Sequence, residues 1–193
     1  MKSSLSFPLM AGLVNVRGVA FMEAIVPPAY PMDDIEAMGE EGADLFRELR
    51  DPQQGRELIV EQNIFIESLL AEGPVTRDLG HEEMEVYREP FRNPEDRKPI
   101  LMWPRELPIE GEPERNVEAV ERVGEWLKTS PTPKLLLYAR PGAIVPPEAA
   151  GWMREHYHNL QTRFVGPGRH YIQEDHPEII ARNLAGWYLE EVR

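Results

Sequence analysis

Three short apolar runs recur along the chain, and each is closed by glycine or proline. They cover residues 16–22, 134–139 and 161–165, and after them stand Val26-Pro-Pro, Arg140-Pro-Gly and Gly166-Pro-Gly. Continuous apolar runs of this length are typical of strands buried on both faces of a parallel sheet. The pattern therefore predicts three parallel strands.

Helical spacing of apolar residues appears between and after these runs. It covers residues 114–128 and 177–192, and residues 146–157 are a shorter helix candidate. Because strands that alternate with helices form βαβ crossovers, we expect an α/β fold built on a parallel sheet.

The middle of the chain has a different pattern. Residues 33–50 and 57–70 carry apolar side chains at helical spacing, and residues 81–87 predict a short helix. The proline-rich stretch 90–113 is expected to be mostly loop. A helical excursion between two strands of a parallel sheet is typical of a lid.

Charge separates the same two parts of the chain. The protein has 34 acidic and 21 basic side chains, a net charge of -13. Residues 28–112 hold 22 acidic and 9 basic side chains, so this segment carries the whole net charge and indicates an acidic lobe in a neutral scaffold. This balance disfavours nucleic acid, whose binding needs clustered Lys and Arg, and it equally disfavours an anionic membrane surface.

The amino-acid composition also restricts the cellular compartment and the types of site that the protein can have. The sequence has no cysteine, which excludes disulfides, cysteine-based metal sites and a thiol nucleophile. The longest candidate membrane span is broken by Arg17, Glu23 and Pro27-Pro28, so no transmembrane helix is expected. The first 16 residues resemble a signal peptide only weakly, because Pro8 interrupts their apolar run. We expect a soluble, cytoplasmic protein.

Two polar residues follow predicted strands. Glu23 stands after the first run, and His170 stands after the third, beyond Gly166-Pro-Gly. Since ligands bind at the carboxyl ends of parallel strands, we expect both residues at one sheet edge. There a carboxylate can orient an imidazole that takes a proton. The alternative is that Glu23 caps a turn and His170 lies in a polar loop.

A nucleophile to complete this pair is not evident. The sequence has no G-x-S-x-G or G-x-D-x-G motif, which would present a nucleophile on a sharp strand-to-helix turn. Ser3, Ser4 and Ser6 have no strand before them. A sheet of three strands is also thin, and the first strand lacks a neighbour on its outer side. We expect a partner chain, an unpaired edge or a longer protein of which this sequence is a piece.

Six longer motifs indicate a family. In order along the chain they are Gly18-Val-Ala-Phe-Met-Glu23-Ala-Ile, Gly55-Arg-Glu-Leu-Ile-Val-Glu-Gln-Asn-Ile-Phe-Ile-Glu67, Tyr87-Arg-Glu-Pro-Phe91, Trp103-Pro-Arg-Glu-Leu-Pro-Ile-Glu-Gly111, Pro133-Lys-Leu-Leu-Leu and Gly166-Pro-Gly-Arg-His-Tyr-Ile-Gln-Glu-Asp-His-Pro177. Together they resemble the C-terminal two thirds of a haloalkane dehalogenase, an α/β-hydrolase with a helical cap. The resemblance implies a truncated α/β-hydrolase fold, with the C-terminal strands and helices of the core plus the cap.

The resemblance also implies a reaction. An Asp carboxylate displaces halide from an sp³ carbon, and a His-activated water hydrolyses the resulting alkyl-enzyme ester to an alcohol. No cofactor or metal is needed, and the partners are a small apolar haloalkane and a halide ion. By the same matching, His170 is the general base and Glu23 the catalytic acid. Another subfamily has an Asp after the next strand, but here Arg140-Pro-Gly-Ala stands in that place.

Domains and a pocket follow from the same resemblance. Residues 1–27 would hold a core strand with the catalytic acid, residues 28–112 the cap, and residues 113–193 the remaining core with the catalytic His. The residues matched to the pocket lining are Phe65, Leu69, Pro104, Leu107, Ile144 and Tyr171.

One part of the family pattern has no counterpart here. The first third, which holds the nucleophilic Asp and the halide-binding side chains, is not matched. We therefore expect the chain to be inactive alone and to self-associate through an exposed sheet edge. Two other functions stay open. One is a non-catalytic remnant that binds an apolar ligand or a partner; the other is a coelenterazine luciferase, disfavoured because residues 141–147 and 166–170 look closer to dehalogenases.

Overall fold

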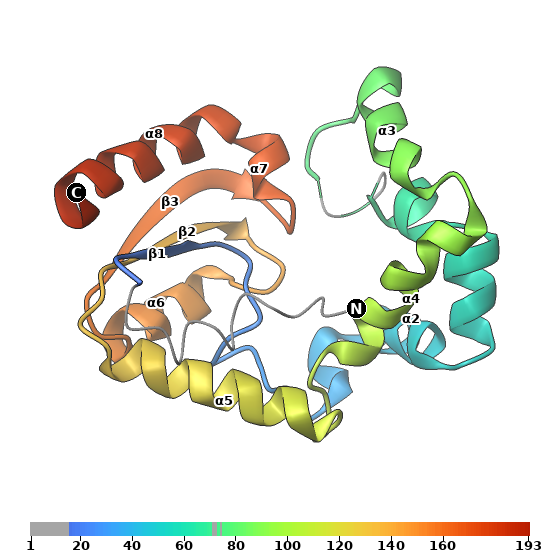
Figure 1. Ribbon diagram of the computed structural model, residues 1–193, viewed down its shortest axis with the longest axis horizontal. Helices are drawn as coiled ribbons and strands as arrows, with labels where there is room; N and C mark the ends of the chain where they lie inside the picture. The colour runs from blue at the N-terminus through green and yellow to red at the C-terminus, as the bar shows by residue number, and fades with distance from the viewer. Residues whose placement is uncertain (1–15, 71–72, 74) are drawn as a thin grey trace.

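A computed structural model describes residues 16–70, 73 and 75–193, and a parallel sheet forms the middle of one half of the molecule (Figure 1). Its strands are β1 (Val19–Phe21), β2 (Lys134–Pro141) and β3 (Leu160–Gly168), in the order β1-β2-β3. Val19 pairs with Lys134, and Lys134 pairs with Leu160. The three predicted parallel strands are confirmed. Residues 1–15, which make up nearly all of the segment compared above with a signal peptide and include Ser3, Ser4 and Ser6, lie outside the described residues.

Helices cover both faces of the sheet because β2 is apolar on both sides. Leu136 packs into one cluster with residues of α5 (Glu114–Thr129) and α6 (Pro147–His156). Leu135 and Leu137 point to the opposite face and pack with residues of α8 (Pro177–Trp187). The positions of α5, α6 and α8 agree with the predicted helices. α8 continues into a π-helical turn, η6 (Tyr188–Val192). Figure 1 shows the resulting three layers.

The first residue of β2 is a fully buried lysine, Lys134. Its Nζ donates to the backbone oxygens of Ser130 at 2.7 Å, Thr132 at 2.9 Å and His158 at 2.8 Å. Desolvation by burial lowers the pKa of Lys134 to about 8. Three carbonyls therefore take the place of water around this amino group, at the amino end of the sheet.

A helical lobe, defined here as residues 35–106, lies beside the sheet (Figure 1). Two apolar clusters include residues of this lobe, one around Ile35 and Ala43, which also contains Leu107 just beyond the lobe, and the other around Ile66 and Met84. Its elements are η1 (Ile35–Met38), α2 (Glu40–Arg50), η2 (Arg56–Glu61), η3 (Phe65–Leu70), α3 (His81–Arg88), η4 (Glu89–Phe91), η5 (Pro94–Arg97) and α4 (Lys98–Glu106).

Two helices of the lobe are interrupted where the sequence predicts continuous ones. The predicted helix over 33–50 divides at Gly39, which has φ +80° and separates η1 from α2. The predicted helix over 57–70 divides at Asn63, which has φ +56° and lies between the π-helical η2 and η3. Glycine and asparagine are the residues that tolerate this left-handed region. The apolar spacing continues across both breaks and so hides them in the sequence.

The prediction that residues 90–113 are mostly loop is wrong. The short helices η4 and η5 and the longer α4 occupy most of the range up to residue 106. Pro90, Pro94 and Pro99 lie at the first or second position of these helices, where no backbone N–H is required. Here proline starts helices instead of preventing them.

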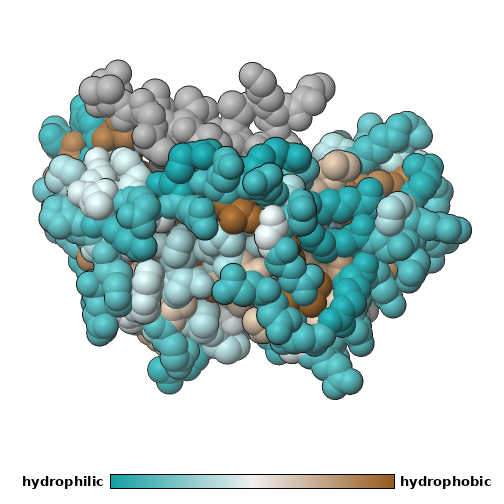
Figure 2. Space-filling view, turned by 90° about the horizontal axis from the view of Figure 1, so that it is seen from below, coloured by the Kyte–Doolittle hydropathy of each residue, from teal (hydrophilic) through white to brown (hydrophobic). Residues whose placement is uncertain are grey.

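In the described part of the chain, no helix has both the length and the apolar character needed to cross a membrane. The face seen in Figure 2 is mostly hydrophilic, with small, separate apolar spots. This surface agrees with the net charge of -13.

Candidate active site

The site begins with Glu23, which stands two residues after the end of β1 and is 8% exposed. Glu23 has φ +43°, a left-handed backbone conformation that costs a non-glycine residue roughly 1–2 kcal/mol. Such outliers are concentrated at functional sites, where the surrounding structure holds them in place. Here the conformation turns the chain out of the strand and brings the carboxylate to the loop after β2.

Backbone amides of that loop hold the carboxylate. Glu23 Oε2 accepts from the N–H of Ala143 at 3.1 Å and of Ile144 at 2.7 Å, and Oε1 accepts from the N–H of Val145 at 3.3 Å. Gly142 opens the loop with φ +71°, and a Cβ added there would lie 2.7 Å from the backbone oxygen of Val145. The turn therefore requires glycine, and it presents three donors to one side chain.

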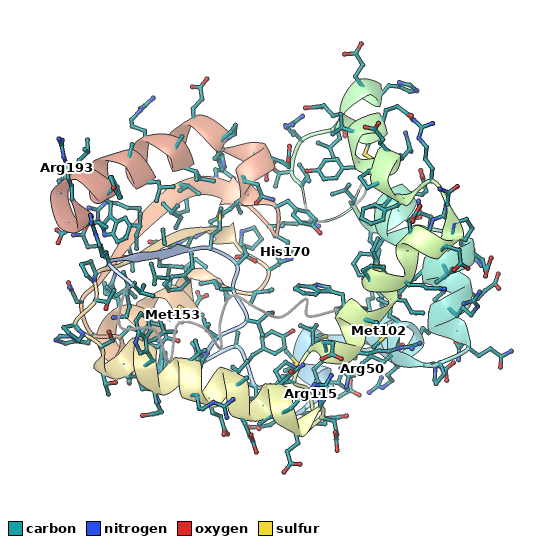
Figure 3. All side chains as sticks on the ribbon, in the orientation of Figure 1. Arg50, Met102, Arg115, Met153, His170 and Arg193 are labelled. Atoms are coloured by element: carbon teal, nitrogen blue, oxygen red, sulfur yellow. The ribbon has the colours of Figure 1, made fainter. Side chains whose placement is uncertain are left out.

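His170 reaches the same carboxylate from the loop after β3. Its Nδ1 lies 3.4 Å from Glu23 Oε2, and its side chain is 36% exposed. This separation is long for a hydrogen bond. Since a carboxylate oxygen accepts, Nδ1 carries a proton in this contact, and in the neutral form of the ring Nε2 then has a free lone pair. In Figure 3, His170 lies where the core faces the helical lobe.

The end of β3 fixes where this loop begins. Gly166 has φ +137°, and a Cβ added there would lie 2.6 Å from His176 Nε2, so the ring of His176 packs directly on the strand. The N–H of Gly142 donates to the oxygen of Gly168 at 3.0 Å and ties the ends of β2 and β3 together. The Glu23 and His170 loops therefore leave the same edge of the sheet, as the sequence predicts.

The residues matched to a pocket fall into separate places. Leu107 is buried in the cluster around Ile35 and Ala43, and Ile144 packs against that cluster. Tyr171 packs instead against the cluster around Ile66. Phe65 and Leu69 are half-buried in η3, and Pro104 is buried in α4. The structure thus brings Glu23 and His170 into contact, and the shared pocket stays a prediction.

Sequence reasoning missed the groups that support this pair. The amides of residues 143–145 are invisible to a search for side-chain types, although the Arg140-Pro-Gly turn signals a tight loop there. Glu174 and Asp175, which contact the lobe, stand inside a motif in which the sequence resemblance assigns roles only to His170 and Tyr171.

Within the described residues, no group of three or more His, Asp or Glu side chains could hold a metal ion.

Solved structures define the class to which this arrangement belongs. Over 95% of its length the chain superposes on a crystal structure of a putative ancestral haloalkane dehalogenase, with a TM-score of 0.89 and 42% sequence identity. It superposes over the same share on haloalkane dehalogenase DbeA from Bradyrhizobium elkani, with a TM-score of 0.87 and 41% identity. It covers 63% and 62% of those chains. The fold is that of the α/β-hydrolases, with an incomplete core.

Curated sequences narrow the class further. The chain is 41% identical over 201 residues to a haloalkane dehalogenase of Bradyrhizobium diazoefficiens, and 39% identical over 178 residues to one of Mesorhizobium japonicum. The chain is therefore a homologue of the haloalkane dehalogenase family. The alignments cover 99% and 92% of this chain but only 64% and 57% of the relatives' length. No protein-family model matches the sequence. The luciferase alternative gains no support from these comparisons.

Proposed function

We propose that this chain carries the base and its supporting carboxylate for a haloalkane dehalogenase reaction, which converts a haloalkane and water to an alcohol, a halide ion and a proton. The observation that carries the proposal is the contact between Glu23 and His170 at the carboxyl edge of the parallel sheet. Homology to haloalkane dehalogenases over nearly the whole chain supports the choice of reaction.

The reaction divides into two steps. In the first, a carboxylate oxygen attacks the sp³ carbon, and the electron pair of the carbon–halogen bond leaves with the halide. In the second, Nε2 of His170 takes a proton from water, and the water oxygen attacks the carbonyl carbon of the ester. The alkoxide leaves as the alcohol with that proton, and the carboxyl group loses the other proton of the water to solvent, which restores the carboxylate. The atoms balance without a cofactor.

Each residue of the pair has a separate role in the second step. His170 touches the reacting water and acts as the base. Glu23 accepts a hydrogen bond from Nδ1, and this contact leaves Nε2 free to take the proton from water. Glu23 then stabilises the imidazolium that forms. Three backbone amides orient Glu23 for this role.

The nucleophile is the part of the site that this pair does not provide. In the described residues no hydrogen bond to Nε2 of His170 is found. The resemblance places the nucleophilic Asp in the first third of the family's chain, and this chain spans 64% of its Bradyrhizobium relative. We propose that the nucleophile comes from polypeptide outside this chain.

The helical lobe would then act as the cap. Residues 28–112 would close over a small, apolar haloalkane, and the matched pocket residues would line the space. Tyr171 supports this arrangement, because it follows His170 directly and packs against apolar side chains of the lobe. Residues 1–27 and 113–193 would form the core.

Bromide release from 1,2-dibromoethane tests the proposal. One sample is the 193-residue chain, and the other is a fusion that places the first third of the Bradyrhizobium diazoefficiens relative before residue 16. We expect no release by the chain alone and release by the fusion. In the fusion, His170→Ala should lower the rate about a hundredfold or more, the usual contribution of a general base. His81→Ala, at an exposed histidine of α3, is the matched control and should have no effect.

The outcomes separate the parts of the proposal. A folded, active fusion whose rate is unchanged by His170→Ala would contradict the role of the base. If the 193-residue chain releases bromide and His170→Ala abolishes this release, the role of His170 as the base would be supported. The nucleophile would then lie within this chain.

A further inference from the structure

The lobe is fastened to the core at the segment that follows His170. This segment is α7 (Ile172–Asp175), and its last residue receives the loop before α3. Asp175 Oδ1 accepts from the backbone N–H of Thr76 at 2.9 Å and of Arg77 at 3.3 Å. One carboxylate of the core thus binds two consecutive amides of the lobe.

Glu174 forms the second half of the junction. Its Oε1 accepts from the hydroxyl of Tyr87 at 2.5 Å, and its Oε2 accepts from the Arg77 guanidinium at 3.2 Å. The Nε of Arg77 also donates to the backbone oxygen of Glu174 at 2.9 Å. Burial, together with the bond to Glu174, raises the pKa of Tyr87 to about 12, so its hydroxyl remains a donor near neutral pH.

Arg77 is itself held in place from the lobe side. Glu83 of α3 accepts from both terminal nitrogens of Arg77, at 2.9 Å and 2.7 Å. The carboxylate of Glu83 also accepts from the N–H of Gly80 at 2.8 Å. The guanidinium is therefore oriented before it meets Glu174, and such paired charge-assisted bonds are geometrically specific.

An apolar contact runs parallel to these bonds. Tyr171 lies between His170 and α7, and its ring packs against the cluster of Ile66, Leu70 and Met84 in the lobe. The centroids of the His170 and Tyr171 rings are 4.9 Å apart. Movement of the lobe relative to α7 would therefore reach the imidazole through one neighbouring ring.

The contact with Glu23 is too weak to position His170 by itself. It is a single bond of 3.4 Å, the side chain of His170 is 36% exposed, and a typical net hydrogen bond contributes only about 1 kcal/mol. The loop carrying His170 is short and is anchored at Gly168 on one side and at α7 on the other. The position of the ring consequently depends on how firmly α7 is held.

We propose that Glu174 and Asp175 are positioning residues, which clamp the lobe onto α7 and thereby hold His170 within reach of Glu23. The role rests on the proposed function, because it is defined toward the base of that reaction. Without the clamp, the lobe loop over residues 76–83 would open and the imidazole would leave the carboxylate. The test therefore needs one measurement on the lobe and another on the ring.

The tautomer of His170 provides the measurement on the ring. While Glu23 accepts from Nδ1, the neutral ring carries its proton on Nδ1, whereas a free imidazole in water favours the Nε2 form. Ring ¹⁵N chemical shifts distinguish the two forms in the 193-residue chain, and loss of the signals in His170→Ala assigns them. Amide hydrogen exchange over residues 76–88 provides the measurement on the lobe.

Asp175→Ala should change both measurements. We expect exchange over residues 76–88 to accelerate about tenfold and the Nδ1–H form of His170 to give way to the Nε2–H form. Asp175→Asn keeps an oxygen that can accept from both amides, so it should restore most of the protection and the tautomer. Glu178→Ala, at an exposed residue of the following helix, should change neither. If Asp175→Ala does not fold, Tyr87→Phe removes one bond to Glu174, keeps the ring, and should cause a smaller change of both in the same direction.

Faster exchange with an unchanged tautomer would overturn the proposal, because Glu174 and Asp175 would then fasten the lobe without positioning the base. Unchanged exchange in a folded Asp175→Ala protein would overturn it as well. Neither measurement needs a haloalkane or a nucleophile. A failure here is therefore distinct from a failure of the fusion to release bromide.

Discussion

Glu23 is held by the backbone more firmly than His170 is held by Glu23. Three amides reach the carboxylate at 2.7–3.3 Å, whereas the imidazole lies 3.4 Å away. The sequence predicts both side chains, because each is a polar residue that follows an apolar run. It does not predict the amides, since every residue except proline carries the same donor and only the folded loop aims three of them at one point.

Replacement of Glu23 tests this support. Glu23→Ala leaves three amides without their acceptor and should lower the free energy of unfolding by about 2 kcal/mol. Glu23→Gln keeps an oxygen that can accept, and its cost should be about half as large. Urea denaturation measures both, with the exposed Glu148→Ala as a control. Equal stability of Glu23→Ala and Glu148→Ala would contradict the account.

The lowered pKa of Lys134 should make the free energy of unfolding depend on pH. Burial lowers its pKa to about 8 in the folded protein, from 10.5 in the unfolded chain. Between these values the unfolded chain binds more protons, so the contribution of Lys134 to the free energy of unfolding increases as the pH rises from 8 to 10.5.

Lys134→Met isolates this contribution. It removes the titration, and it leaves the carbonyls of Thr132 and His158 without their donor, which should cost about 2 kcal/mol at neutral pH. Urea denaturation at several pH values should show the wild-type protein gaining stability over the variant above pH 8. A difference that stays constant from pH 7 to pH 10 would contradict the lowered pKa.

At the scale of elements, the sheet and its covering helices follow from the sequence because burial on both faces leaves an unbroken apolar run. The lobe is harder to predict. Proline blocks the interior of a helix but favours its first turn, so the same residues at 90–99 fit a loop or a series of helix starts. The breaks at Gly39 and Asn63 depend on single positive φ angles, which apolar spacing does not reveal.

Replacement by alanine should change the stability of the protein in opposite directions at Gly142 and at Gly151. Gly142 has φ +71°, and its added Cβ would lie 2.7 Å from the oxygen of Val145, so Gly142→Ala should destabilise the protein by about 2 kcal/mol. Gly151 lies inside α6 with open space around it, and Gly151→Ala should stabilise by about 0.5–1 kcal/mol. Thermal unfolding measures both. A neutral Gly142→Ala would show that the loop does not require glycine.

At the scale of the whole molecule, charge and fold divide the chain in a similar way. The helical lobe falls within residues 28–112, the segment that carries the whole net charge of -13. The division into cap and core stays a prediction, as does self-association. In the described residues β1 pairs only with β2, and an unpaired edge of this kind favours association.

The nucleophile of the proposed reaction could not be predicted as a residue, because the sequence has no G-x-S-x-G or G-x-D-x-G motif. The resemblance places the nucleophile in the first third of the family's chain, and the alignments leave more than a third of each relative's length unmatched. A polypeptide that completes the sheet beside β1 would supply both the strand and the nucleophile under this account.

Trapping of the alkyl-enzyme ester tests whether His170 is the base of the second step. The fusion described above, carrying His170→Ala, is mixed with 1,2-dibromoethane and analysed by mass spectrometry of the intact protein. A bromoethyl ester should accumulate, because the first step proceeds and the base of the second step is missing. The fusion with His170 intact should show no lasting adduct and continuous bromide release. Continuous release without an adduct in the His170→Ala fusion would contradict the assignment of His170 as the base.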